Sequence, residues 1–128
     1  MRFYTIQMSK WRKLKGSGIE LVDTTVRSGD KRLAPSWEIV LNVKSGKITE
    51  EQYTEIYIKM MRESFRTHKE FWLELCNRED TFALACYCPP FSFCHRRLLI
   101  DILQAVCTHF KIPFEYLGEL TEEKLNEL

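Results

Sequence analysis

The segment Thr81–Cys86 reads Thr-Phe-Ala-Leu-Ala-Cys and constrains the fold more than any other part of this sequence. A strand with one solvent-exposed face alternates apolar and polar residues, whereas a continuous apolar run of this length is typical of a strand covered on both faces. Such strands lie inside parallel sheets that carry helices on either side. The run therefore predicts an α/β fold in which this strand is central.

Strand-like and helix-like segments alternate along the rest of the chain, which favours a largely parallel sheet with right-handed crossovers. The predicted strands are short runs bounded by turn residues, and they span residues 3–8, 19–26, 81–86 and 113–117. We predict a single-domain, three-layer, Rossmann-like α/β fold over residues 1–128. Its mainly parallel sheet would have about four strands flanked by helices.

Two helix starts carry a recognisable capping pattern. The motif TEEQ at residues 49–52 precedes apolar residues at helical spacing, and it predicts a helix capped by Thr49. The motif THKE at residues 67–70 predicts that a shorter helix begins after Thr67. The other predicted elements are a short helix capped by Ser9, a short helix or turn over residues 37–43, a helix over residues 95–110 and a terminal turn or tail over residues 122–128.

The charge balance disfavours one class of function. The 128 residues include 19 basic and 18 acidic side chains, for a formal net charge of +1. A general nucleic-acid-binding protein usually has a strong basic excess. The start of the chain lacks the apolar core of a signal peptide, and no run approaches the length of a membrane span. We therefore expect a cytoplasmic protein with no membrane partner.

Three of the five cysteines, Cys86, Cys88 and Cys94, fall within one short segment. In a reducing compartment such a cluster indicates free thiols, metal ligation or reactivity rather than disulfide cross-links. In parallel sheets, ligands bind beyond the carboxyl ends of the strands. The predicted strand ends carry residues 9–10, 23–27 and 86–88, so we expect the site there.

Two arginines open the predicted helix that follows the cysteine segment. Arg96 and Arg97 lie in its first turn, where a cation is disfavoured by about 0.3–1 kcal/mol because the helix start is itself positive. A nearby anion would offset this cost: a bound phosphate, the carboxylate of Asp23 or a cysteine thiolate. The alternative is that one arginine points into water and pairs with a surface acid.

The cysteines allow three interpretations. Cys88 or Cys94, close to a helix start and two arginines, could have a lowered pKa and act as a catalytic nucleophile. His95 would assist only if its ring turns toward the thiol, which adjacent helical residues do not favour. Zinc could bind Cys86, Cys88, Cys94 and His95, although their spacing departs from the usual one. Alternatively the cysteines are buried apolar residues, as we expect for Cys76, Cys86 and Cys107.

Other polar and aromatic residues are candidate ligand contacts. Asp23, Thr24 and Arg27 could bind a ribose or a phosphate. Trp37 follows Pro35 and Ser36 in a loop region and could stack on a ring, as could Trp11 beside Ser9 and Lys10. Core packing is the alternative for both tryptophans, and Tyr53 and Tyr57 would line a groove or belong to the core.

Several of these segments together resemble a known family. The stretches YTIQMSKWR, GIELVDTTVRSG, APSWEIV and LACYCPPFSFCHRRLL are similar to the domain-of-unknown-function 488 family, especially its compact bacterial and phage-type members. The resemblance implies a small Rossmann-like fold with a pocket around Asp23, Cys88, Cys94, His95 and Arg96. It implies no reaction, and it allows a phage-encoded accessory role such as binding a host nucleotide signal.

Our leading hypothesis is a binding module for a small anionic, nucleotide-like ligand, with no cofactor. Arg96 and Arg27 would bind phosphate, Asp23 and Thr24 a ribose, and Trp11 or Trp37 a ring. Many relatives place an arginine directly after the strand aspartate, whereas Thr24 and Thr25 intervene here, which leaves the role of Arg27 open. The alternatives are a cysteine-dependent enzyme and a ligand-free, zinc-stabilised interaction domain. The sequence leaves the oligomeric state open, a homo-oligomer included.

Overall fold

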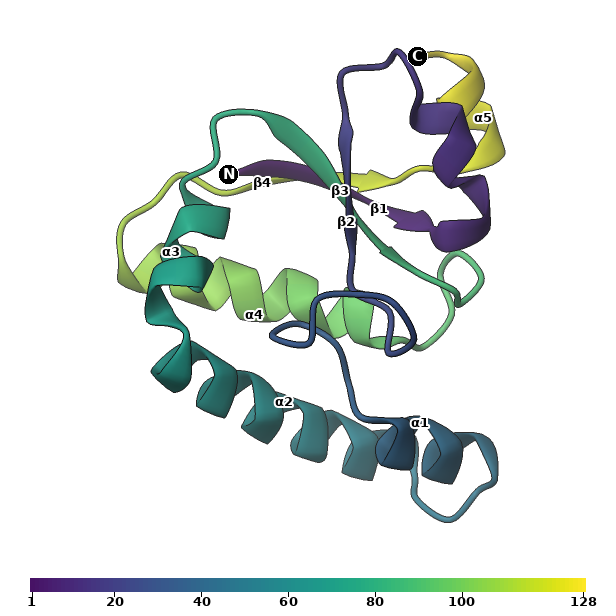
Figure 1. The fold of residues 1–128 in the computed structure, drawn as a ribbon, viewed down its shortest axis with the longest axis vertical. Coiled ribbons are helices and arrows are strands. Elements are labelled where there is room, and N and C mark those ends of the chain that lie inside the picture. Colours follow the sequence, from purple (N-terminus) through teal and green to yellow (C-terminus); the bar gives the residue numbers. More distant parts are fainter.

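The computed structural model describes residues 1–128, and its four strands form one all-parallel sheet in the order β2-β3-β1-β4 (Figure 1). This confirms the predicted α/β fold with a parallel sheet flanked by helices. The elements in chain order are β1 (Arg2–Gln7), η1 (Met8–Leu14), β2 (Glu20–Asp23), α1 (Trp37–Lys44), α2 (Glu50–Thr67), α3 (Lys69–Cys76), β3 (Thr81–Cys86), α4 (His95–His109), β4 (Glu115–Glu119) and α5 (Glu122–Asn126).

The sheet separates two apolar cores, which explains the continuous apolar run of β3. Helices α2, α3 and α4 cover one face, where Phe82 and Leu84 join a core that includes Trp72. The 3₁₀ helix η1 and helix α5 cover the other face, where Ala83 and Ala85 pack (Figure 1). From Phe82 to Cys86 every residue of the strand is buried, so β3 has no wet face.

Helix α2 begins as the sequence predicts, and helix α3 does not. At the start of α2, the Thr49 hydroxyl accepts from the Gln52 N–H, and the Gln52 side chain accepts from the Thr49 N–H. Thr67, by contrast, is the last residue of α2, and its hydroxyl donates to Glu63 at 3.5 Å. His68 separates the two helices without a side-chain cap, so the second predicted capping box is wrong.

Strand β2 is shorter than predicted, which matters for the site. The prediction extends it to residue 26, but the strand ends at Asp23. The Asp23 carboxylate accepts hydrogen bonds from the Thr25 N–H at 2.8 Å and from the Ser28 hydroxyl at 2.6 Å. These bonds turn the chain out of the sheet and create a loop beyond the strand.

The amino- and carboxyl-terminal elements also differ from their predictions. Strand β4 starts two residues later than predicted, because Pro113 has no N–H and the first bond to β1 is from the Glu115 N–H to the Met1 carbonyl. The predicted terminal tail contains α5, which Thr121 caps and whose Leu125 is buried.

Ser9 does not cap η1, since that helix begins at Met8 after Gln7. Trp37–Lys44 is a helix, capped by Ser36.

No helix in the structure combines the length and the apolar character that crossing a bilayer requires.

Candidate functional site

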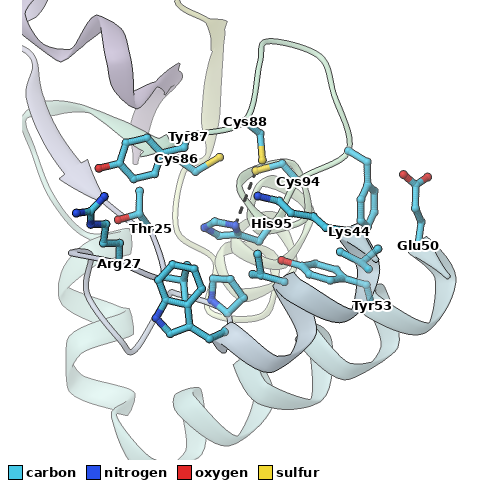
Figure 2. Close-up of a pocket in the computed structure, with 16 residues that line it drawn as sticks. Thr25, Arg27, Lys44, Glu50, Tyr53, Cys86, Tyr87, Cys88, Cys94 and His95 are labelled. Carbon is cyan, nitrogen blue, oxygen red and sulfur yellow. Dashed lines mark hydrogen bonds between the residues drawn. The ribbon is translucent and has the colours of Figure 1, made fainter. Parts of the chain in front are cut away.

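A cavity of about 490 Å³ opens beyond the carboxyl ends of β2 and β3. The loop after β2 forms one wall with Thr25 and Arg27, while α1 and the first turn of α2 form another. The end of β3, the following loop and the start of α4 bring three cysteines and His95 to the same cavity (Figure 2). This is where parallel α/β sheets place their ligands.

The loop after β2 depends on one glycine. The Gly29 N–H donates to the Thr25 carbonyl at 2.9 Å, which closes a tight turn. A Cβ atom at Gly29 would lie 2.3 Å from the Thr25 nitrogen and 2.6 Å from the Asp23 carbonyl oxygen. Only glycine fits so close to the backbone, so this residue fixes the wall that carries Arg27.

Cys86, Cys88 and Cys94 place their sulfur atoms within 4.8 Å of one another on one side of the cavity (Figure 2). They come from the last position of β3, from the loop that follows it and from the N-cap of α4. Cys86 and Cys94 are buried, whereas Cys88 is half-buried and faces the cavity. These three soft donors could hold a metal ion. His95, the fourth predicted zinc ligand, does not belong to that group.

His95 is held in one tautomer by its partners. Its Nε2 lies 2.7 Å from the Thr24 carbonyl oxygen, which can only accept, so Nε2 carries the hydrogen. The Thr24 hydroxyl, which itself donates to the Ala85 carbonyl, lies 3.0 Å from the same nitrogen and can accept from it too. Nδ1 is therefore an acceptor. Burial lowers the pKa of His95 to about 4, so the ring is neutral near pH 7.

Nδ1 of His95 faces the Cys94 sulfur at 3.8 Å (Figure 2). The sequence disfavours this pairing, because adjacent residues of a helix point in different directions. Cys94, however, is the N-cap and has extended backbone angles, with φ −169° and ψ 154°. It stands outside the helix, where its sulfur accepts the capping hydrogen bond from the Arg96 N–H at 3.4 Å and also lies beside the His95 ring.

Arg96 is fully buried, and its anion is part of the protein. Its Nη2 lies 3.0 Å from the Glu119 carboxylate, whose side chain is also fully buried. Thr5 donates to the same carboxylate at 2.7 Å, which leaves its hydroxyl oxygen to accept from Tyr116. Asp23, one of the three anions considered from the sequence, does not pair with Arg96; the acid that does is Glu119, which carried no sequence signal. The third candidate, a cysteine sulfur, also contacts Arg96, since Cys86 accepts from Nη1 at 2.6 Å.

The guanidinium of Arg96 also organises the cysteine segment. Its Nη1 donates to the Cys86 sulfur at 2.6 Å and to the Cys88 carbonyl at 2.9 Å. Its Nη2 contacts the Pro89 carbonyl oxygen at 3.3 Å. Arg96 thus ties the loop after β3 to α4 and β4, and it does this behind the cavity rather than inside it.

The three thiols differ in their pKa values. Hydrogen bonds from Cys86 and Cys94 lower the pKa of Cys88 well below its usual range, and the charge of Arg96 acts in the same direction. The pKa of Cys94 is raised, first because of its hydrogen bond with Cys86, and the pKa of Cys86 is raised mainly by Cys88. Cys88, the most accessible sulfur, is therefore the thiol of the group that most readily loses its proton.

Aromatic side chains and unpaired charges occupy the rest of the cavity. Trp37 and Tyr87 are 53% and 54% exposed, so both rings have free faces at the mouth. The hydroxyl of Tyr53 points into the pocket (Figure 2), and burial raises its pKa, so it keeps its proton as a donor. Arg27 and Lys44 line the cavity without an ion pair.

The predicted site residues fall into two groups. The cavity is lined by Arg27, Trp37, Tyr53, Cys86, Cys88, Cys94 and His95. The others lie outside it: Asp23 holds the loop after β2, Thr24 accepts from His95, Tyr57 is buried in the core, Arg96 pairs with Glu119, and Ser9, Lys10 and Trp11 belong to η1.

Sequence reasoning missed several lining residues. Lys44 is in the last turn of α1 and Glu50 in the first turn of α2, and the corner between these helices brings both to the cavity. Tyr87 and Phe93 flank Cys88 and Cys94 in sequence, which was the available signal. Lys44 and Glu50 carried none, because their placement depends on how α1 meets α2.

The fold and the site together define a small parallel α/β protein with a thiol-lined pocket at its strand ends. Residues 11–106 match the family model DUF488-N3a, described as the active DUF488-N3 subclade. The chain therefore belongs to the DUF488 family, which confirms the resemblance of its sequence motifs. No curated protein and no solved structure matches the chain.

Proposed function

We propose that this protein binds a small anionic ligand with a planar ring, such as a nucleotide, in the cavity beyond β2 and β3. One observation carries the proposal: Arg27 and Lys44, two cations without acidic partners, line the same cavity as the exposed rings of Trp37 and Tyr87. The volume of about 490 Å³ lies within the range of about 300–1,000 Å³ that small-molecule sites occupy.

We propose a separate role for each side of the cavity. Arg27 offers a planar guanidinium that can bind two phosphate oxygens at once, and Lys44 offers a second positive charge from another wall. Trp37 and Tyr87 offer flat surfaces for a ring. Tyr53 can donate a hydrogen bond to a polar edge. Arg96 takes no part, because its charge is already paired with Glu119.

We expect that Arg27→Gln and Lys44→Gln each weaken binding of a nucleotide about tenfold to a hundredfold, because each removes a charge-assisted hydrogen bond of about 1.5–3 kcal/mol. The measurement is calorimetric titration with a panel of nucleoside mono-, di- and triphosphates. Arg62→Gln and Lys47→Gln are matched controls, since both side chains are exposed and outside the cavity. Absence of binding by every member, or equal losses in the control variants, would refute the proposal.

The thiol cluster favours a second candidate function, a cysteine-dependent enzyme that acts on the bound ligand. Cys88 is the accessible thiol with a lowered pKa, and Cys94 lies near it with its sulfur 3.8 Å from Nδ1 of His95, which carries no hydrogen. A thiolate at the edge of a ligand cavity can attack an electrophilic carbon of that ligand. In this arrangement Cys88 is the nucleophile, and Cys94, whose pKa is raised, is a proton donor.

We expect iodoacetamide at pH 6 to alkylate Cys88 at least about tenfold faster than any other cysteine, because only a thiolate reacts and ordinary thiols are protonated there. Peptide mapping of the modified protein measures the labelling at each position. Cys76 and Cys107, which are buried away from the cavity, serve as internal references. Slow and uniform labelling of all five thiols would rule out this candidate.

A further inference from the structure

We propose that Cys88 and Cys94 form a thiol–disulfide pair that a hydroperoxide oxidises at the edge of the cavity. This activity goes beyond ligand binding and needs no bound nucleotide, although it uses the same Cys88 sulfur as the second candidate function. It would make the site sensitive to the redox state of its surroundings.

The proposal starts from the positions of the sulfur atoms. All three lie within 4.8 Å of one another, and a disulfide requires about 2.05 Å between two of them. Cys88 lies in the loop between β3 and α4, where Arg96 holds its carbonyl oxygen at 2.9 Å while its side chain faces the cavity, and Cys94 is the extended N-cap residue. Rotation of the Cys88 side chain with a small shift of the loop can close the distance, whereas a cysteine inside a helix or strand would resist it.

Cys88 is the sulfur that a peroxide reaches first. It is half-buried and lines the cavity, while Cys86 and Cys94 are 2% and 3% exposed. The two buried thiols lie beside it, and the positive guanidinium of Arg96 contacts its carbonyl oxygen at 2.9 Å. An accessible sulfur in an electropositive setting with a neighbouring thiol is the arrangement that favours oxidation through a sulfenic acid.

Cys94, rather than Cys86, is placed to complete the disulfide. Arg96 donates to both buried sulfurs, but its Nη1 lies 2.6 Å from Cys86 and 3.7 Å from Cys94. The Cys86 sulfur is thus held more closely, at the end of a buried strand, whereas Cys94 keeps a longer capping bond of 3.4 Å from the Arg96 N–H. The Cys94 sulfur lies 3.8 Å from Nδ1 of His95, whose lone pair is available because Nε2 carries the hydrogen. His95 can therefore accept the Cys94 proton when that sulfur attacks.

The reaction has two steps. The Cys88 thiolate attacks one oxygen of the hydroperoxide, so that an S–O bond forms, the O–O bond breaks, and the hydroxide or alkoxide that leaves takes a proton from water. The Cys94 sulfur then attacks the Cys88 sulfenic acid, the S–S bond forms and the S–O bond breaks. The leaving hydroxide receives the Cys94 proton through His95 and becomes water. The two cysteines lose two electrons, and the peroxide gains them.

The test uses the full chain, purified without chelator, reduced and freed of reductant, then treated with one equivalent of hydrogen peroxide without nucleotide. We expect two of the five thiols to disappear, the mass to fall by two hydrogens, and peptide mapping to show a Cys88–Cys94 linkage. Cys94→Ser should stop at a sulfenic acid on Cys88, which dimedone traps. Cys88→Ser should lose both products, and Cys107→Ala should behave as the wild type.

Three outcomes would overturn the proposal. In the first, all five thiols persist and dimedone traps nothing on Cys88. In the second, a disulfide forms equally well in Cys88→Ser. In the third, about one equivalent of zinc co-purifies and protects the cysteines until it is removed, which would make the cluster a metal site. Selective alkylation of Cys88 without a disulfide would leave the second candidate function standing and refute this inference alone.

Discussion

Replacing Arg96 by methionine should lower the free energy of unfolding by about 3–5 kcal/mol. The substitution removes one partner of an ion pair whose two side chains are fully buried, and it leaves the Glu119 carboxylate charged and without its cation. It also removes the donors that bind Cys86 and the Cys88 carbonyl. Urea denaturation followed by circular dichroism measures the change.

A double variant separates two causes of the lost stability: the Glu119 carboxylate left without its cation, and the lost contacts of the Arg96 side chain. Glu119→Gln keeps an acceptor for the Thr5 hydroxyl but carries no charge, so the double variant of Arg96→Met and Glu119→Gln should be more stable than Arg96→Met alone. Arg66→Met breaks the exposed pair with Glu63 and should change stability by about 0–1 kcal/mol. A double variant no more stable than Arg96→Met would show that the buried charge is not the main cost.

The protein should lose about 3 kcal/mol of stability through His95 as the pH falls from 6.5 to 4. The pKa of His95 is lowered from 6.5 to about 4 in the folded protein, chiefly by burial. Between these values the unfolded chain binds a proton that the folded chain excludes, so acid favours unfolding. The contribution is complete above pH 6.5, and below pH 4 both states are protonated and the loss stops growing.

His95→Gln is the matched comparison for this pH dependence. The glutamine amide can donate to the Thr24 carbonyl as Nε2 does, but it does not titrate. The Cys88 thiolate adds a pH dependence of the same sign, because its lowered pKa favours the folded state at higher pH. The difference between the two proteins therefore isolates His95. Parallel stability curves from pH 4 to 7 would contradict the prediction.

The fold was predictable where the local signals agree with the tertiary packing. The apolar run of β3 and the capping box at Thr49 are each explained within a few residues, and both predictions are confirmed. The errors have two kinds of cause. Strand β2 ends early because the Asp23 carboxylate binds Thr25 and Ser28, two and five residues further on, and these short-range bonds outweigh the strand-like pattern of residues 19–26. Strand β4 is displaced because Met1, far away in the chain, supplies its first acceptor, and the local sequence pattern does not show that contact.

The position of the candidate cavity was easier to predict than its contacts. The strand ends and the cysteine segment pointed to the edge of the sheet where the cavity opens, and the cost of Arg96 in the first helical turn pointed to a nearby anion. The identity of that anion depends on Glu119 facing Arg96 from β4, which no spacing rule indicates among 18 acidic residues. Lys44 likewise reaches the cavity only through the corner between α1 and α2.

The sheet order has a consequence for how this family is delimited. The matching stretch, residues 11–106, contains β2 and β3 but neither β1 nor β4. Because β1 lies between β3 and β4, a polypeptide trimmed to that stretch would keep a two-stranded ribbon with the apolar edge of β3 uncovered, and it would lack Glu119. The part of the chain that matches the family model is thus smaller than the part that builds the sheet.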